Sequence, residues 1–156
     1  METTVSVNAV ADYFIKRAHE SGDPITNLKL QKLVYYAEAW HLAIHGKPLT
    51  GEAFQAWIHG PVSRLLYARF KDNKWAPIVD EVTEPDLPGA VVDVLKDVWE
   101  VYGGLSALDL ERMTHSEQPW IEARGGCPPD ERCETVISPR TMGVFYSSKL
   151  KANEGP

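Results

Sequence analysis

Several features that mark large classes of protein are missing from this sequence. Only two cysteines occur, Cys127 and Cys133 in the segment CPPDERC, so no disulfide framework can carry the fold, and their spacing matches no common zinc motif. We interpret both as thiols of a surface loop. No apolar run approaches the roughly 18 residues that span a bilayer, and the opening METTVSVNAV lacks the charged and apolar regions of a signal peptide. The sequence therefore predicts a cytoplasmic protein that does not engage a membrane.

An excess of positive charge is also missing. The chain has 16 Lys and Arg against 22 Asp and Glu, which gives a formal net charge of -6. Because contacts with phosphates need clustered Lys and Arg, we expect no nucleic-acid partner, and a basic protein surface suits this charge better. The patterns G-x-S-x-G, H-E-x-x-H, G-x-G-x-x-G and the phosphate-binding Walker loop are absent. We therefore expect a protein that is not an enzyme and needs no cofactor.

What the sequence does contain is one long and strongly apolar segment, TNLKLQKLVYYAEAWHLAIH, from Thr26 to His45. At the helical period its apolar side chains cover most of the circumference, and such a helix, roughly 30 Å long, is buried by neighbours on several sides. The chain has 156 residues, of which 44% are hydrophobic, so one domain with its own core is expected. We predict a mostly α fold, a single compact helical domain around this long buried central helix. Its polar side chains fall into one narrow stripe: Asn27, Gln31, Glu38, His41 and His45.

Two lysines, Lys29 and Lys32, interrupt the apolar surface of this helix. Each can lay its methylene stem along a neighbouring helix and keep its ammonium group in water. The polar stripe permits a sharper hypothesis, because Glu38, His41 and His45 have the spacing E-x-x-H-x-x-x-H and could offer a metal three ligands. No second E-x-x-H occurs to complete a di-metal site. We therefore favour the interpretation that these three residues form the solvated edge of the helix, with no metal bound.

Capping residues, prolines and glycines divide the rest of the chain into further elements. Before the central helix we predict a helix that Ser6 or Asn8 caps and Gly22 ends. After it we predict an extended piece or short helical turn at residues 52–58, and a helix that begins at Pro61 with Val62, Leu65, Leu66 and Phe70 on its buried face. Residues 71–90 read as a loop, and one strand in it could pair with residues 54–58 as a small two-stranded β ribbon.

The C-terminal half follows the same logic. A helix runs from Ala90 to the Gly103-Gly104 pair, and a shorter helix capped by Ser106 is closed by Pro119-Trp120. The remaining predictions are a surface loop at residues 121–135, a final helix of about two turns after Ser138, and a frayed tail at residues 149–156. The domain should therefore span residues 1–148.

Three blocks of the sequence are specific when they are read together. They are LKLQKLVYYAEAWHLAIHGKPL (Leu28 to Leu49), EAFQAWIHGPV (Glu52 to Val62) and LSALDLERMTHSEQPW (Leu105 to Trp120). In order and spacing they resemble the Panacea domain, also called the SocA-like or GepA-type phage-associated domain. The resemblance covers roughly residues 8–122, and residues 137–146 resemble the closing segment of the family. It implies a mostly helical antitoxin of a bacterial or prophage toxin-antitoxin system that binds and neutralises a toxin, expected from the adjacent gene.

The blocks contain the residues that we assign to the scaffold of such a domain: Gln31, Lys32, Tyr36, Trp40, Trp57, Gly60, Pro61 and Trp120. Most of them are explained by core packing or turn geometry. Gln31 and Lys32 are polar inside an apolar helix, and an unpaired amide there would cost about 1–3 kcal/mol. We therefore predict that they make buried hydrogen bonds to the Gly60-Pro61 corner or to the loop around His115.

The surface that would bind a toxin is not marked by these blocks. Three surfaces are candidates: the loop at residues 71–88 with its aromatic residue Trp75, the outer side of the helix predicted after Pro61 with Arg64 and Arg69, and the C-terminal tail. The family resemblance also implies an alternative function, that of an adaptor which delivers its bound toxin to a protease. An alternative of another class is a small metal-dependent enzyme that uses the Glu38, His41 and His45 face.

Overall fold

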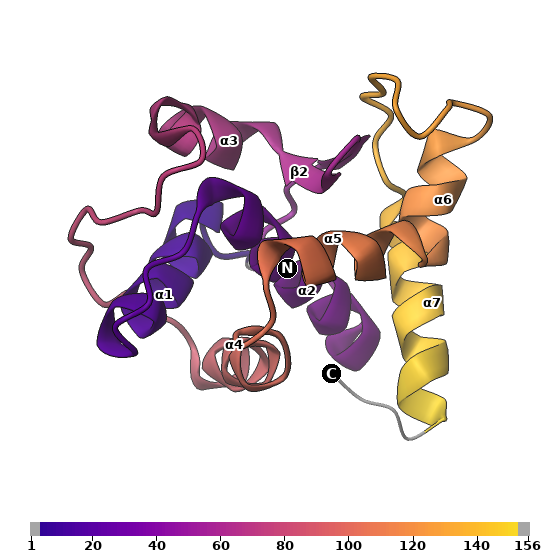
Figure 1. Cartoon of the computed structure of the whole chain (residues 1–156). Coiled ribbons are helices and arrows are strands. Elements are labelled where there is room, and N and C mark those ends of the chain that lie inside the picture. Colours follow the sequence, from indigo (N-terminus) through magenta and orange to yellow (C-terminus); the bar gives the residue numbers. More distant parts are fainter. Residues whose placement is uncertain (1–3, 153–156) are drawn as a thin grey trace.

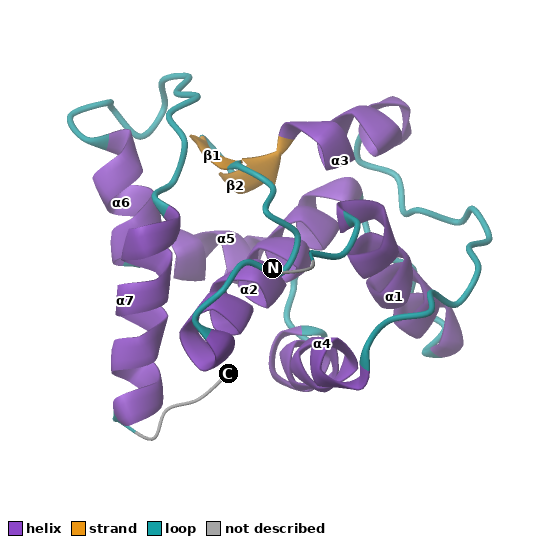
Figure 2. Ribbon diagram, turned by 180° about the vertical axis from the view of Figure 1, so that it is seen from behind, coloured by secondary structure: helices purple, strands orange, loops and turns teal. Residues whose placement is uncertain are grey.

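Seven α-helices and one β-hairpin form residues 4–152, the part of the chain that this computed structural model describes. Figure 1 shows α1 and α7 on opposite sides of α2, with α4 below it and the hairpin and α3 above, and the reverse view in Figure 2 shows the same arrangement. The elements, in chain order, are α1 (Val7–Glu20), α2 (Asn27–His45), β1 (Phe54–Trp57), β2 (Gly60–Ser63), α3 (Arg64–Phe70), the short 3-10 helix η1 (Lys71–Asn73), α4 (Gly89–Tyr102), α5 (Ala107–His115), α6 (Gln118–Arg124) and α7 (Pro139–Lys151).

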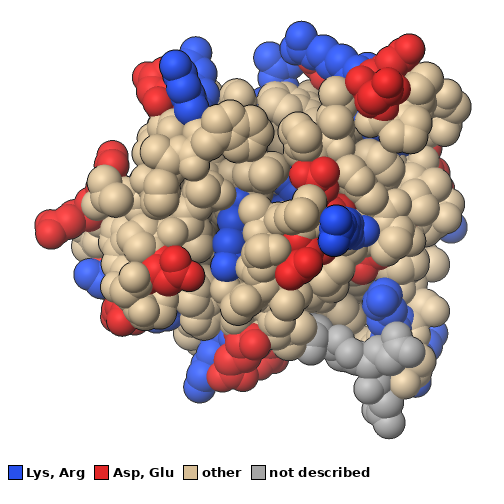
Figure 3. Space-filling view, viewed as in Figure 1, with Lys and Arg blue, Asp and Glu red and all other residues tan. Residues whose placement is uncertain are grey.

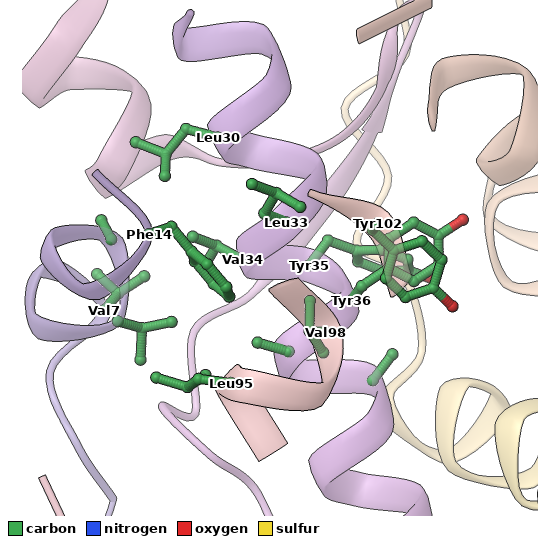
Figure 4. Packing of buried hydrophobic residues seen from close by; sticks show 14 of the residues in the cluster. Val7, Phe14, Leu30, Leu33, Val34, Tyr35, Tyr36, Leu95, Val98 and Tyr102 are labelled. Carbon is green, nitrogen blue, oxygen red and sulfur yellow. The ribbon is translucent and has the colours of Figure 1, made fainter. Parts of the chain in front are cut away.

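Helix α2 lies at the centre because almost all of its surface is apolar. It packs against α1, α3, α4, α5, α7 and β2, and every residue from Leu30 to His41 is buried. Figure 4 shows Phe14 of α1 beside Val34 of α2, with Leu95 of α4 below them in the same cluster. Full burial of each such side chain contributes about 1.5–3 kcal/mol. The mostly α fold, compact around a buried central helix, is confirmed.

Most helix starts follow the predicted capping residues. The side chains of Ser6, Thr26, Ser106 and Ser138 each accept a hydrogen bond from a backbone N–H in the first turn of their helix. This satisfies one of the donors that a helix N-terminus leaves unpaired. At the other end of α2, Gly46 adopts the left-handed conformation, with φ of 70°. The cap at Thr26 and the glycine at residue 46 therefore set the two ends of the central helix.

The predictions for the hairpin were partly wrong. Residues 52–58 do contain an extended strand, but its partner is β2 rather than the loop after residue 71, and Ala56 pairs with Pro61. The helix α3 begins at Arg64, after the cap Ser63, rather than at Pro61. The cause is the two-residue turn between β1 and β2, which lets the chain reverse directly. Pro61 is tolerated because β2 is an edge strand, on which a missing N–H leaves no partner unpaired.

Two later parts of the chain without helical structure are fixed by backbone hydrogen bonds. Ala56 donates its N–H to Thr135 O at 2.9 Å and Ile137 donates to Phe54 O at 2.7 Å, so residues 135–137 line β1 on its free edge. The 74–88 segment has no regular structure and holds Ile78 in the core, where its N–H donates to Ile25 O at 2.8 Å. The strand considered for residues 71–90 is therefore absent from this described segment.

The C-terminal region is more helical than predicted. Pro119 lies in the first turn of α6 instead of closing α5, so residues 121–124 are helical. Earlier in the chain, Leu65 of α3 was predicted to be buried but is half exposed. Helix α7 has 13 residues, about twice the predicted two turns, and extends to Lys151. Residues 153–156 of the expected tail lie outside the described residues. Within residues 4–152 no helix has the length and apolar character to cross a membrane.

Candidate functional site

A groove of about 590 Å³ opens where the N-terminal turn of α2 meets the hairpin, α3 and the loops on either side. Figure 3 shows Lys and Arg side chains projecting at the upper edge of the molecule, on the side of α3 and the hairpin. The residues that line the groove are Asn27, Leu28, Gln31, Trp57, Ile58, His59, Val62, Tyr67, Lys71, Lys74, Trp75 and Arg132. A second hollow of about 580 Å³ lies between the end of α2 and α7, and its lining contains no aromatic side chain. The first groove is therefore the stronger candidate for a binding site.

The aromatic walls of the groove are Trp57 on the hairpin, Tyr67 on α3 and Trp75 after η1. Trp57 and Tyr67 meet edge to face with ring centroids 5.0 Å apart. Trp57 is held further by its indole N–H, which donates to Gln55 Oε1 at 2.8 Å, and by its carbonyl, which accepts from Trp120 Nε1 at 2.9 Å. A wall that is fixed at three points can receive a partner without first being ordered.

Trp75, in contrast, projects into solvent. Its relative exposure is 72%, and its ring is nearly perpendicular to that of His59, with the two centroids 6.2 Å apart. The preceding residue Lys74 has φ of 53° and ψ of -117°, and it is the only described residue other than glycine with positive φ. A lysine in this conformation is strained. The chain therefore adopts a strained turn at Lys74 and leaves the Trp75 side chain exposed to solvent.

The floor of the groove is polar and comes from α2 and β2. Gln31 is 1% exposed, and its Oε1 accepts the N–H of Ser63 at 3.0 Å while its Nε2 donates to Asn27 Oδ1 at 3.2 Å. The predicted buried hydrogen bonds of Gln31 exist, but they join it to Ser63 at the end of β2 and to Asn27, not to Gly60 or Pro61. The same prediction was wrong for Lys32, whose hydrogen bond is to Leu28 O within its own helix. Asn27 is only 5% exposed as a residue, but its Nδ2, which has no hydrogen-bond partner within residues 4–152, still reaches solvent.

Lys32, the next residue on α2, lies directly under the hairpin. It is 0% exposed, and its Nζ donates to Leu28 O at 3.4 Å. The expectation of a solvated ammonium group was wrong for Lys32, because Gly60 packs against its methylene stem: a Cβ atom on Gly60 would overlap Lys32 Cε. Burial lowers the pKa of Lys32 to about 7, and the carboxylate of Glu111 opposes that shift. Lys29 differs, since it is half-buried and donates to Gly103 O at 2.6 Å.

The remaining scaffold residues form a buried network between α2, α4, α6 and α7. Tyr36 and Tyr102 stack with ring centroids 4.2 Å apart, and Trp40 Nε1 donates to Tyr102 OH at 2.9 Å. The carboxylate of Glu117 accepts hydrogen bonds from Tyr36 OH at 2.8 Å and Tyr146 OH at 2.7 Å. Burial raises the pKa of Glu117, and these two hydrogen bonds oppose the shift. The network joins helices that are far apart in sequence, which is a structural role.

The interpretation of the polar stripe as a solvated edge was wrong for two of its three residues. Glu38 is 3% exposed, and its carboxylate accepts hydrogen bonds from Leu49 N at 2.7 Å and Thr50 N at 3.0 Å. His41 is 6% exposed, and its Nδ1 lies 2.7 Å from Lys47 O. These residues fasten the chain after α2 back onto the helix, and only His45 is exposed. Among the described residues, no group of three His, Cys, Asp or Glu side chains is placed to hold a metal.

Of the three residues suggested for toxin binding, only Trp75 lines the groove. Arg69 turns toward α1, where it pairs with Asp12 at 2.7 Å. Arg64 is exposed and lies 3.5 Å from Glu134. Both arginines are therefore at least partly neutralised by acids of this chain.

Sequence reasoning included Lys71 and Lys74 in the loop at residues 71–88 that it named as a candidate surface, but it did not place Asn27, Tyr67 or Arg132 there. The segment KDNKW, with two lysines and a tryptophan within five residues, carries the signal for this part of the site. Nothing in the sequence indicated Arg132, which lies in the loop that Arg124 anchors. Arg124 is 5% exposed and donates to Ala56 O at 3.1 Å and Glu131 O at 2.7 Å.

The antitoxin SocA-like Panacea domain family matches residues 30–121, a range that contains Lys32, Gly60 and the aromatic walls of the groove. The chain belongs to this family. A relative from Caulobacter vibrioides (strain NA1000 / CB15N), the Antitoxin SocA, is 32% identical over 130 residues, which cover 75% of this chain and 69% of the relative. No solved structure gives a significant match. Asn27 and Arg132 lie outside the range that the family domain covers.

Proposed function

We propose that this protein is an antitoxin that neutralises a cognate toxin by binding it directly, and that the toxin docks in the groove between Trp57 and Trp75. Membership of an antitoxin family supports the class of function. The observation that carries the site is Trp75, which is 72% exposed on a strained turn at the rim of a preformed groove. Exposed aromatic anchors beside pockets are typical of the centre of a protein interface.

Direct binding needs no reactive group on the antitoxin. It needs a rigid surface, because each flexible side chain ordered on binding reduces the affinity. The hairpin supplies that rigidity: Gly60 packs onto Lys32, and Trp120 holds the Trp57 carbonyl. In this proposal the scaffold residues act by positioning the groove, and the toxin contacts Trp57, Tyr67 and Trp75. In this proposal the antitoxin acts in the cytoplasm, where it binds the toxin as the adjacent gene is expressed.

Co-expression tests the proposal. The product of the adjacent gene is induced in a heterologous host alone, with the wild-type protein, and with the Trp75→Ala variant. We expect growth arrest, rescue, and loss of rescue, respectively. Trp75→Ala should keep the wild-type Tm, because an exposed side chain contributes little to folding. The control is Val144→Ala on α7, which removes another exposed apolar side chain, 65% accessible, and should still rescue.

The result can also contradict the proposal or favour an alternative mechanism. A harmless neighbour, or a toxic one that the wild-type protein does not rescue, contradicts it for this chain. Immunoblots of the toxin separate sequestration from delivery to a protease: sequestration leaves the toxin level unchanged, whereas an adaptor lowers it in a protease-dependent way. Elemental analysis addresses the metal-enzyme alternative, which requires a stoichiometric metal that His41→Ala removes.

A further inference from the structure

We propose that the groove recognises an acidic segment of the toxin, whose carboxylates meet Asn27, Lys71 and Lys74 while one large apolar side chain inserts between Trp57 and Trp75. This inference rests on the proposed function and names the chemistry of the partner segment. It reverses the expectation from net charge, which favoured a basic partner surface.

The charge of the groove differs in sign from that of the whole chain. The protein has a net charge of -6, yet the lining contains Lys71, Lys74 and Arg132 and not one carboxylate. Among the described residues neither Lys71 nor Lys74 takes part in an ion pair, whereas Arg132 pairs with Glu134 at 2.6 Å. Two unpaired ammonium groups on the rim favour an anionic partner and speed its approach.

The floor supplies a hydrogen-bond donor of its own. Asn27 is 95% buried as a residue, and its Oδ1 already accepts a hydrogen bond from Gln31. Its Nδ2 has no hydrogen-bond partner within residues 4–152 and is not among the atoms closed to solvent, so it can donate to an acceptor that enters the groove. A carboxylate oxygen of a bound segment is such an acceptor. Floor and rim therefore favour the same chemistry, although they come from different elements.

The walls require an apolar group in addition. Trp57, Ile58, Val62, Tyr67 and Trp75 line the space between the floor and the lysines. Binding one large side chain there would remove most of the exposed surface of Trp75 from water, at about 25 cal/mol for each Å² buried. A segment that is acidic on both sides of one bulky apolar residue fits both the walls and the rim.

A nucleic acid, which also carries negative charge and stacking bases, fits less well. Binding a single strand needs a basic track several nucleotides long. Here acids interrupt the surroundings of the groove, since Glu134 neutralises Arg132 and Glu111 pairs with His59 at 3.1 Å. The two free lysines lie on one side of the groove only, on η1 and the residue after it. This distribution suits a short acidic peptide segment.

The test uses the toxin that the wild-type protein rescues, purified in a catalytically inactive form. Affinity is measured by calorimetry at 50 mM and 300 mM NaCl for the wild type, for Lys71→Glu/Lys74→Glu, and for the matched control Lys47→Glu/Lys96→Glu. The control makes the same change in net charge at two exposed lysines outside the groove. We expect Lys71→Glu/Lys74→Glu to bind about tenfold more weakly or worse and to lose salt dependence, and the control to stay within about threefold of the wild type.

A photo-crosslinking side chain in place of Trp75 then identifies the contacted toxin segment by mass spectrometry. The proposal expects a segment rich in Asp and Glu, and Asp/Glu→Lys changes in it should restore binding to Lys71→Glu/Lys74→Glu. Equal losses for both double variants, a crosslink to a basic segment, or binding that is insensitive to salt would overturn it. So would tight binding of a fluorescent dT20 oligonucleotide that Trp75→Ala abolishes. If the wild-type protein does not rescue growth, that result contradicts the proposed antitoxin function itself, before the chemistry of the toxin segment is in question.

Discussion

At the scale of single residues, the packing of Gly60 against Lys32 leaves no room for a side chain at residue 60. Gly60 has φ of 113°, and a Cβ atom there would overlap Lys32 Cε and lie 3.0 Å from Thr114 Oγ1. Gly60→Ala should therefore lower the free energy of unfolding by about 2–4 kcal/mol, through backbone strain and overpacking. Urea denaturation measures this. Gly126→Ala is the control, because a Cβ atom there meets nothing within 4 Å, and an equal loss in both variants would contradict the role of the contact.

Lys32 itself should give the protein an unusual pH dependence. Its folded pKa is about 7, against an ordinary value of 10.5, so between these values the unfolded chain binds more protons than the folded one. Stability therefore rises with pH across this window, by on the order of 3 kcal/mol between pH 7 and pH 9.5 for this one group. The isosteric variant Lys32→Met has no such group.

The measurement is the difference in unfolding free energy between wild type and Lys32→Met at several pH values. Taking this difference cancels, to first order, the contributions of the other titrating groups to the pH dependence. His115 and Glu111 face Lys32, so the same measurement is repeated in the backgrounds His115→Gln and Glu111→Gln. We expect Lys32→Met to gain relative stability as the pH falls from 9.5 to 7. Parallel curves would show that Lys32 keeps an ordinary pKa.

At the scale of elements, Arg124 links the end of α6 to β1 and to the loop that carries Arg132. Arg124→Met keeps the aliphatic bulk and removes the hydrogen bonds to Ala56 O and Glu131 O. We expect faster amide hydrogen exchange in residues 126–135, with α1 unchanged, because the loop loses its internal anchor. Arg112→Met on α5, an exposed arginine, is the control. Exchange that stays slow in residues 126–135 would mean that other contacts hold this loop.

Elements that are defined by local chemistry were predictable from the sequence. Helix α2 has its cap at Thr26 and its stop at Gly46, and both act over a few residues. Pro61 and Pro119 were misread because proline suits several local settings, and the choice among them depends on tertiary pairing. Pro61 lies in a strand because residues 60–63 pair with β1. Glu38 is buried because Leu49 and Thr50 return to the helix and donate to its carboxylate. Neither long-range contact can be read from the helical periodicity of the sequence.

At the scale of the whole molecule, the groove could be predicted only in part for a related reason. Its lining comes from α2, the hairpin, α3, η1 and the loop before α7, five parts of the chain that meet only after folding. Trp75 was recognisable because a tryptophan in a polar loop has no obvious core to join. Asn27 and Arg132 were not, since one belongs to a helix that reads as core and the other to a loop without a motif. Net charge does not reveal the basic side chains of the groove, because it averages over the whole chain.

The separation between the strained, exposed segment around Lys74 and the buried Lys32-Gly60 contact also bears on how such proteins diversify. Substitutions at exposed positions such as Lys71 and Trp75 change folding stability by about 0.5 kcal/mol or less, whereas those at Lys74 also change the strain of its backbone. Selection for a new toxin can therefore act on them while the interior of α2 and the hairpin remains under purifying selection. Gene duplicates would then diverge fastest at the rim of the groove, and a library randomised at these three positions offers a route to antitoxins with altered partners.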